Sequence, residues 1–236
     1  MQPVIKLPPE MTFEPPPTYP NLPDIAIVVE HTRAPYGLKQ VRFVNSFQTF
    51  DLLFAVNHQK IEVFNNTGDK VTTLSSKKIR HRWQRLIDKE RLLKILETQF
   101  DMRLKPIRIT LREGDKLHKE GEKLHFQIEP SDKRLNALTL FNLAGNGELQ
   151  FLYPLTDPKV NNPLMIQKFP YTSPPMEVIP PFGGDDLVVL LCEKPATGLH
   201  ILLKETQPNM PNPNMILFHL SNNRCQVGQY AFFSGE

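Results

Sequence analysis

Proline restricts what this chain can fold into. The 236 residues include 23 prolines, about twice the usual share of roughly 5%. Because proline fixes φ and lacks a backbone N–H, it is largely excluded from helix interiors and central strands. The composition therefore favours a loop-rich protein of strands and turns. Since 40% of the residues are hydrophobic, the chain has enough apolar side chains to bury a core.

The sequence divides into three regions. Residues 1–23 hold eight of the prolines and show no periodicity, which predicts an extended Pro-rich arm. This arm could serve as a ligand for a partner domain, although no basic-flanked P-x-x-P motif stands out in it. Residues 24–103 predict a small α/β unit, and residues 104–236 predict a β-sandwich-like domain. We therefore expect an α+β fold, with a small strand–helix unit followed by a β-sandwich-like domain.

A helix is predicted over residues 76–100, with Ser75 or Ser76 as its N-cap. Its first half places apolar side chains at helical spacing: Ile79, Trp83, Leu86 and Ile87. Beyond Asp88 the apolar stripe rotates around the helix to Leu92, Leu93, Leu96 and Phe100. This shift indicates a kink, or a second helix capped by Asp88.

Strand and turn signals surround this helix. Residues 66–69 (NTGD) predict a hairpin turn in the small unit, and Asn146–Gly147 predicts one in the second domain. After Pro106, strand-like segments recur at intervals of roughly 10–15 residues, which is typical of a β-sandwich or barrel. Residues 186–191 (DLVVLL) are apolar on both faces and predict a central strand. The last predicted elements are short helices over 195–206 and 212–221 and a terminal strand over 224–234.

The stretch FGGDD, residues 182–186, invites comparison with phosphate and metal loops. It has neither the spacing of a Walker loop nor that of a dinucleotide-binding loop, and it precedes a strand instead of a helix. Adjacent residues of a strand point to opposite faces, so Asp185 and Asp186 do not by themselves form a metal site. We interpret the stretch as a tight turn before a buried strand, and expect Asp185→Ala to change stability little.

Catalytic and metal-binding motifs are missing from the sequence. The seven histidines are scattered singly, and neither H-E-x-x-H nor G-x-S-x-G occurs. Cys192 and Cys225 have no C-x-x-C spacing, which argues against a zinc site. Both lie in apolar or strand-like segments, which predicts buried, reduced thiols. These absences predict a protein that is not an enzyme and has no catalytic residue, metal or cofactor. The alternative is a hydrolase whose site is assembled from dispersed residues such as His125 and His219.

Two surfaces are candidates for binding a partner. The first surface is the basic face of the predicted helix, whose residues fall largely opposite Ile79 and Trp83. It is either a binding surface for nucleic acid or for an acidic protein, or an ordinary solvated helix face. The second surface is the excursion Pro154–Pro181, which is either a recognition loop or a cap on the core. The candidate partner-binding residues are Arg80, Arg82, Arg85, Phe169, Tyr171 and Met176.

The net charge of +3 is too small to require a nucleic acid or a membrane surface as partner. No window reaches 18 apolar residues. The first residues also lack the basic segment and apolar run of a signal peptide. We therefore expect a cytoplasmic protein whose partner is another protein.

The strand motifs of the second domain carry a resemblance. KEGEKLHFQIEP, NALTLFNLAGNGELQFLYPL and PPFGGDDLVVLLCEKP, in this order, resemble a bacterial domain of unknown function that accompanies caspase-like peptidases. The matching positions are Gly121–Glu122, Gly147, Leu152–Tyr153–Pro154 and Pro181–Phe182–Gly183. The resemblance covers about residues 104–205. It implies a β-rich accessory module without catalytic residues of its own, which binds or regulates a caspase-like peptidase or is that peptidase's target.

Overall fold

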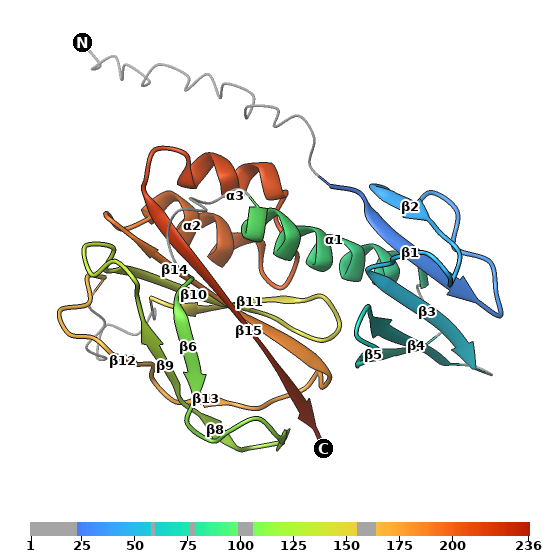
Figure 1. Ribbon diagram of the computed structural model, residues 1–236, viewed down its shortest axis with the longest axis horizontal. Helices are drawn as coiled ribbons and strands as arrows, with labels where there is room; N and C mark the ends of the chain where they lie inside the picture. Colours follow the sequence, from blue (N-terminus) through green and yellow to red (C-terminus); the bar gives the residue numbers. More distant parts are fainter. Residues whose placement is uncertain (1–22, 58–59, 76–78, 99–105, 155–163) are drawn as a thin grey trace, which may run out of the picture.

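The computed structural model describes residues 23–57, 60–75, 79–98, 106–154 and 164–236. Within these ranges the chain is a mixed α+β protein with four sheets and three helices. The longest helix, α1 (Ile79–Thr98), extends from the N-terminal sheet to the two C-terminal helices (Figure 1). No helix in the described ranges is long and apolar enough to cross a membrane.

The N-terminal sheet has five strands in the order β2-β1-β3-β4-β5. These strands are β1 (Ile25–Glu30), β2 (Val41–Phe43), β3 (Leu52–Asn57), β4 (Lys60–Asn65) and β5 (Lys70–Ser75). β1 pairs in parallel with β2 and β3, whereas β3, β4 and β5 form antiparallel hairpins. The predicted turn at residues 66–69 is confirmed, since Asn65 Oδ1 accepts hydrogen bonds from the backbone N–H groups of Thr67 and Asp69.

Helix α1 contributes to two separate cores. Its first half packs on the N-terminal sheet, where the Trp83 ring stacks on Phe54 with 3.9 Å between ring centroids. Its second half packs Leu92 and Leu96 into the core of the next sheet. The helix continues without interruption through Asp88, so the predicted kink or second helix is wrong. The apolar stripe rotates because the helix changes the sheet that it covers.

The central sheet has five strands in the order β11-β10-β14-β15-β7. They are β7 (Leu117–Lys119), β10 (Ala137–Leu143), β11 (Leu149–Tyr153), β14 (Gly184–Cys192) and β15 (Cys225–Gly235). β14 pairs antiparallel with both β10 and β15, which confirms the predicted central strand. The predicted Asn146–Gly147 hairpin joins β10 to β11, and Gly147 has the positive φ of 80° that this turn needs.

The two faces of the central sheet are covered by different elements. Val188 and Leu190 of β14 face the helices α1, α2 (Thr197–Thr206) and α3 (Pro213–Leu220). Leu187 and Val189 face two small sheets on the other side. These small sheets have the orders β12-β9-β6 and β13-β8. Their strands are β6 (Arg108–Leu111), β8 (Lys123–Leu124), β9 (Phe126–Glu129), β12 (Tyr171–Thr172) and β13 (Met176–Glu177).

Cys192 and Cys225 form a disulfide, so the prediction of reduced thiols is wrong. The register of β14 and β15 places the two residues directly opposite each other. They are 33 residues apart in sequence, and only the pairing of the two strands brings their sulfur atoms together.

Candidate partner-binding cleft

A cleft of about 900 Å³ lies between the β1–β2 connection, α1 and the start of α3. We call it the cationic cleft. The lining residues are Gly37, Lys39, Gln40, Arg80, His81, Gln84, Asp88, Arg91, Met210, Pro211, Asn212 and Pro213. Three separate parts of the chain therefore meet around this space.

Hydrogen bonds from α1 fix the β1–β2 connection at one wall of the cationic cleft. Gln84 Oε1 accepts from the backbone N–H of Lys39 at 2.8 Å, and Gln84 Nε2 donates to the carbonyl of Lys39 at 3.2 Å. Arg80 Nη2 donates to the carbonyl of Gly37 at 2.9 Å. Gly37 has a φ of 78°, and a Cβ there would lie 2.9 Å from Arg80 Nη2. The backbone conformation therefore favours glycine at this position, and a Cβ would also displace the end of the Arg80 side chain.

The opposite wall is formed where α3 begins. Asn212 is the N-cap of α3, and its Oδ1 accepts a hydrogen bond from the N–H of Asn214 at 3.0 Å. Pro213 occupies the first turn of the helix, where its missing N–H costs nothing. Met210, Pro211 and Pro213 make this wall of the cationic cleft largely apolar.

Positive charge predominates in the cationic cleft. Lys39, Arg80 and Arg91 line it together with one carboxylate, that of Asp88. Arg91 is buried, and its Nε donates to the carbonyl of Pro23 at 3.2 Å. Burial raises the pKa of Asp88, although its hydrogen bond from Gln84 and the nearby cations act in the opposite direction. An acidic group is thus the ligand whose charge this lining complements.

The three predicted arginines of the basic face are separated in the structure. Arg80 lines the cationic cleft. Arg82 Nη1 donates to Ser75 Oγ at 2.6 Å, at the end of β5. Arg85 forms an ion pair with Glu148 at 2.7 Å and joins α1 to the turn before β11. Lys77 and Lys78, two further basic residues at the start of the helix predicted from the sequence, lie outside the described ranges.

Sequence reasoning missed Lys39 and Arg91 as cleft residues. A signal was present for the second, because Arg80, Gln84, Asp88 and Arg91 recur at intervals of four, four and three residues and share one face of a helix. Lys39 had no such signal, since only the fold brings the β1–β2 connection against α1.

Phe169, Tyr171 and Met176 lie on a different part of the molecule. All three are half-buried and pack against the core on the side of the central sheet that faces away from α1. This packing matches the alternative in which the excursion covers the core, and residues 155–163 of it lie outside the described ranges. Their role in partner binding stays a prediction.

Only Phe182 and Gly183 of the FGGDD stretch precede β14, and Gly184, Asp185 and Asp186 are the first residues of this strand. The two aspartates point to opposite sides as expected. Asp186 faces α1 and pairs with Lys89 at 2.7 Å. Asp185 faces the other side, where it accepts hydrogen bonds from Ser234 Oγ at 2.7 Å and Asn142 Nδ2 at 3.3 Å. Because Asp185 is only 5% exposed, a small effect of Asp185→Ala is no longer expected. The sequence pattern did not show this burial.

Gly183 allows the two parts of the molecule to approach each other. Its φ is 150°, and a Cβ at this position would lie 2.4 Å from the carbonyl oxygen of Val71 in β5. The glycine is therefore needed for close contact between β5 and the start of β14. The described residues contain no group of three or more His, Cys, Asp or Glu side chains that could hold a metal ion.

The histidines form isolated pairs. Thr139 Oγ1 lies 2.7 Å from His200 Nε2, and burial lowers the pKa of His200 to about 4. Thr139 is 1% exposed, so its hydroxyl is not open to a substrate in this conformation. His125 contacts Glu113 at 2.9 Å at a separate place in the small sheets.

Comparison of the chain with protein-family models, with curated proteins and with solved structures finds no match. The class that the described features define is therefore a mixed α+β protein with a cationic cleft between its N-terminal sheet and its C-terminal helices.

Proposed function

We propose that the chain is a non-catalytic module that binds another protein, and that the cationic cleft holds an acidic segment of this partner. The observation that supports the proposal is the convergence of Lys39, Arg80 and Arg91 on one cleft with a single carboxylate, that of Asp88. The volume of about 900 Å³ lies near the upper end of the roughly 300–1,000 Å³ usual for ligand sites. Several side chains of a peptide fit into such a space.

The proposed partner is a caspase-like peptidase or its target, and the support for it is the resemblance of residues 104–205. An accessory β-sandwich-like domain is part of the same proposal. It is supported by the core that the central sheet shares with the β12-β9-β6 sheet. The second proposed contact surface consists of Phe169, Tyr171 and Met176. Each would contact the partner through the part of its half-buried side chain that remains exposed.

A cytoplasmic location is also proposed, and the Cys192–Cys225 disulfide bears on it. Thiols are kept reduced in the cytosol of most cells, where structural disulfides are rare. The proposal thus requires that the protein fold and function with these two cysteines reduced in the cell.

Nucleic acid is the second candidate ligand, because the same three cations would attract phosphate groups. The described lining of the cationic cleft holds no Phe, Tyr or Trp side chain on which a base could stack. An acidic peptide uses the charges without requiring stacking, and is therefore the favoured ligand.

A binding experiment with matched variants tests the proposal. The full chain is titrated with fluorescent peptides rich in Asp and Glu, with the corresponding Asn and Gln peptides, and with a single-stranded oligonucleotide. The cleft variant is Lys39→Gln with Arg80→Gln. The control variant is Lys70→Gln with Arg108→Gln, which removes two exposed cations that pair with Glu62 and Glu129 elsewhere.

We expect the acidic peptides to bind the unmodified chain and the control variant, and to bind the cleft variant at least about tenfold more weakly. Equal binding to both variants would show that the charge attraction is not located in the cationic cleft. Tighter binding of the oligonucleotide than of every acidic peptide, lost in the cleft variant alone, would replace the partner class by nucleic acid.

A further inference from the structure

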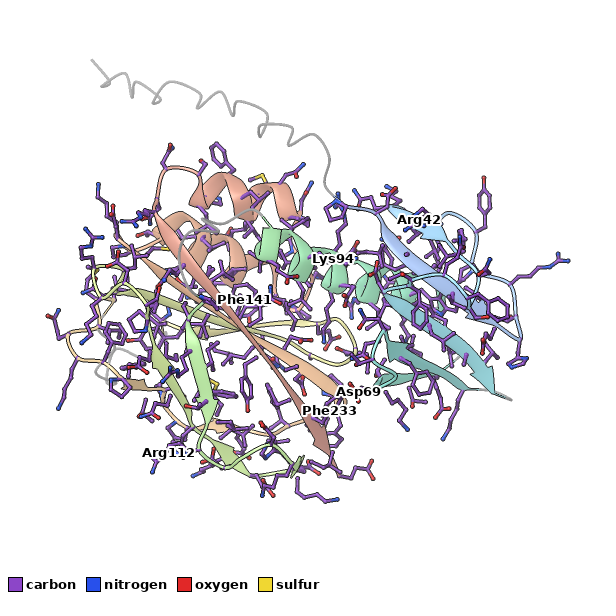
Figure 2. All side chains as sticks on the ribbon, in the orientation of Figure 1. Arg42, Asp69, Lys94, Arg112, Phe141 and Phe233 are labelled. Carbon is purple, nitrogen blue, oxygen red and sulfur yellow. A yellow bond between two sulfur atoms is a disulfide. The ribbon has the colours of Figure 1, made fainter. Side chains whose placement is uncertain are left out.

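A second cavity lies on the other side of α1, between the N-terminal sheet and the central sheet. Its volume is about 290 Å³. We call it the junction cavity. Lys94 of α1 and Phe233 of β15, both labelled in Figure 2, belong to its lining. The α1 residues that line the two spaces fall on opposite sides of the helix by the 3.6-residue period, so the junction cavity is separate from the cationic cleft.

Acidic side chains outnumber basic ones in the junction cavity. Glu90 and Glu97 of α1 and Asp186 of β14 line the space. Asp185 belongs to the lining too, but its carboxylate binds Ser234 and Asn142 on the other face of β14. Two lysines also line the space, Lys89 and Lys94. Both lysines are bound to other groups.

Lys89 is fully used by other groups. Its Nζ donates to Asp186 Oδ2 at 2.7 Å, to the carbonyl of Gly184 at 2.7 Å and to the carbonyl of Ala144 at 3.3 Å. An ammonium group has three donors, so none remains for Glu90. The Lys89 side chain is 4% exposed, and these three bonds hold its ammonium group in place.

Lys94 is held on the N-terminal side. Its Nζ lies 2.5 Å from Asp51 Oδ1. The other oxygen of Asp51 accepts a hydrogen bond from the backbone N–H of Ala26 at 2.8 Å. This bond holds the aspartate beside the start of β1. Lys94 is therefore drawn toward the N-terminal sheet and paired there.

Neither lysine makes a direct bond to Glu90. The Glu90 side chain is half-buried, and it has no hydrogen bond or ion pair with another described side chain. Burial, followed by the negative charges of Asp186 and Asp51, raises the pKa of Glu90 to about 7, although the charges of Lys89 and Lys94 act in the opposite direction. A half-buried carboxylate that faces an open space without a direct partner among the described side chains is a place where a cationic ligand gains binding energy.

We infer that the junction cavity binds a small primary amine, and that the ammonium group of this ligand pairs with Glu90. An ammonium supplies both the missing positive charge and hydrogen-bond donors. A divalent metal ion fits less well, because the described residues bring together no set of three ligating side chains. The cavity is also larger than an ion requires, and a position between two packed parts of a chain is common for small-ligand sites.

Calorimetric titration with n-butylamine tests the inference, and n-butanol serves as a ligand of the same length without charge. The titration is run at pH 8, where Glu90 with a pKa of about 7 is ionised, and at pH 5.5, where it is protonated. We expect butylamine to bind at pH 8, to bind about thirtyfold more weakly at pH 5.5, and butanol not to bind. Equal binding of the two ligands, or no binding of butylamine at millimolar concentration, would overturn the inference.

Two isosteric variants locate the site. Glu90→Gln is expected to abolish both the binding of butylamine and its pH dependence. Glu97→Gln, which removes an exposed carboxylate from the same helix face and the same lining, is expected to weaken binding less than threefold. Thermal melting of each variant checks that it is folded. A specific amine site is excluded if Glu97→Gln weakens binding as much as Glu90→Gln. It is also excluded if Mg²⁺ or Na⁺, added at the same concentration of positive charge, displaces butylamine.

Discussion

Lys89 Nζ lies 2.7 Å from Asp186 Oδ2, and the lysine side chain is 4% exposed. This ion pair joins the middle of α1 to the first residues of β14. The same ammonium also binds the carbonyls of Gly184 and Ala144. The buried ammonium group of Lys89 thus connects α1 to the start of β14 and to the β10–β11 hairpin.

Replacing Lys89 by Met should lower the free energy of unfolding by about 3 kcal/mol or more, because it leaves a carboxylate and two carbonyls without their donor. Urea denaturation at pH 7.5 measures the effect. The matched control is Lys70→Met, which breaks an exposed pair of 3.5 Å with Glu62 and should cost less than about 1 kcal/mol. Similar, small losses in both variants would mean that the buried pair contributes no more than a surface one.

Glu90→Gln should remove a pH dependence of stability. The pKa of Glu90 is raised from 4.5 to about 7 in the folded chain, so the folded state binds more protons than the unfolded state between these values. The free energy of unfolding should therefore fall as the pH rises from about 4.5 to 7, by up to about 3 kcal/mol from this group. In Glu90→Gln that part of the fall disappears, and the variant is more stable than the unmodified chain at pH 8. Parallel pH–stability curves for the two proteins would contradict the prediction.

Removing the disulfide should destabilise the central sheet. The bond joins residues 33 positions apart, and a loop of this length corresponds to roughly 3–4 kcal/mol in the chain-entropy estimate. The double variant Cys192→Ala, Cys225→Ala should show a loss of this order against the oxidised chain. Dithiothreitol should lower the melting temperature of the unmodified chain and leave that of the variant unchanged. An unmodified chain that is insensitive to reductant would show that the disulfide adds no stability, and would remove one difficulty for a cytoplasmic location.

Asp185→Ala should cost about 2 kcal/mol. It removes the closest acceptor of Ser234 Oγ, at 2.7 Å, and one of the two acceptors of Asn142 Nδ2, which keeps its bond to Gln150 Oε1. Burial raises the pKa of Asp185, so part of the loss is offset by removing a desolvated charge. Asp24→Ala, at an exposed aspartate, is the control and should change stability by less than about 0.5 kcal/mol. Equal effects in chemical denaturation would return Asp185 to the minor role expected from the sequence.

Much of the local structure could be predicted from the sequence. The turns at residues 66–69 and 146–147, the central strand near residues 186–191 and the two C-terminal helices all form where they were expected. Each depends on residues close together in the chain: turn residues that accept positive φ, an unbroken apolar run, or apolar residues at helical spacing. Such patterns act through local backbone preferences, and they are present before any tertiary contact forms.

The sites were decided by contacts between distant segments. Arg80 and Arg91 share a helix face, but the cationic cleft exists only because Gly37 and Lys39 are brought against that face. Glu90 looks like an ordinary surface residue in the sequence, and its raised pKa comes from burial between two sheets. Lys89 meets Asp186 across 97 positions of chain only because α1 lies over both the N-terminal and the central sheet. Burial and electrostatic pairing depend on which surfaces pack together, and in this chain one helix shared by two cores determines that packing.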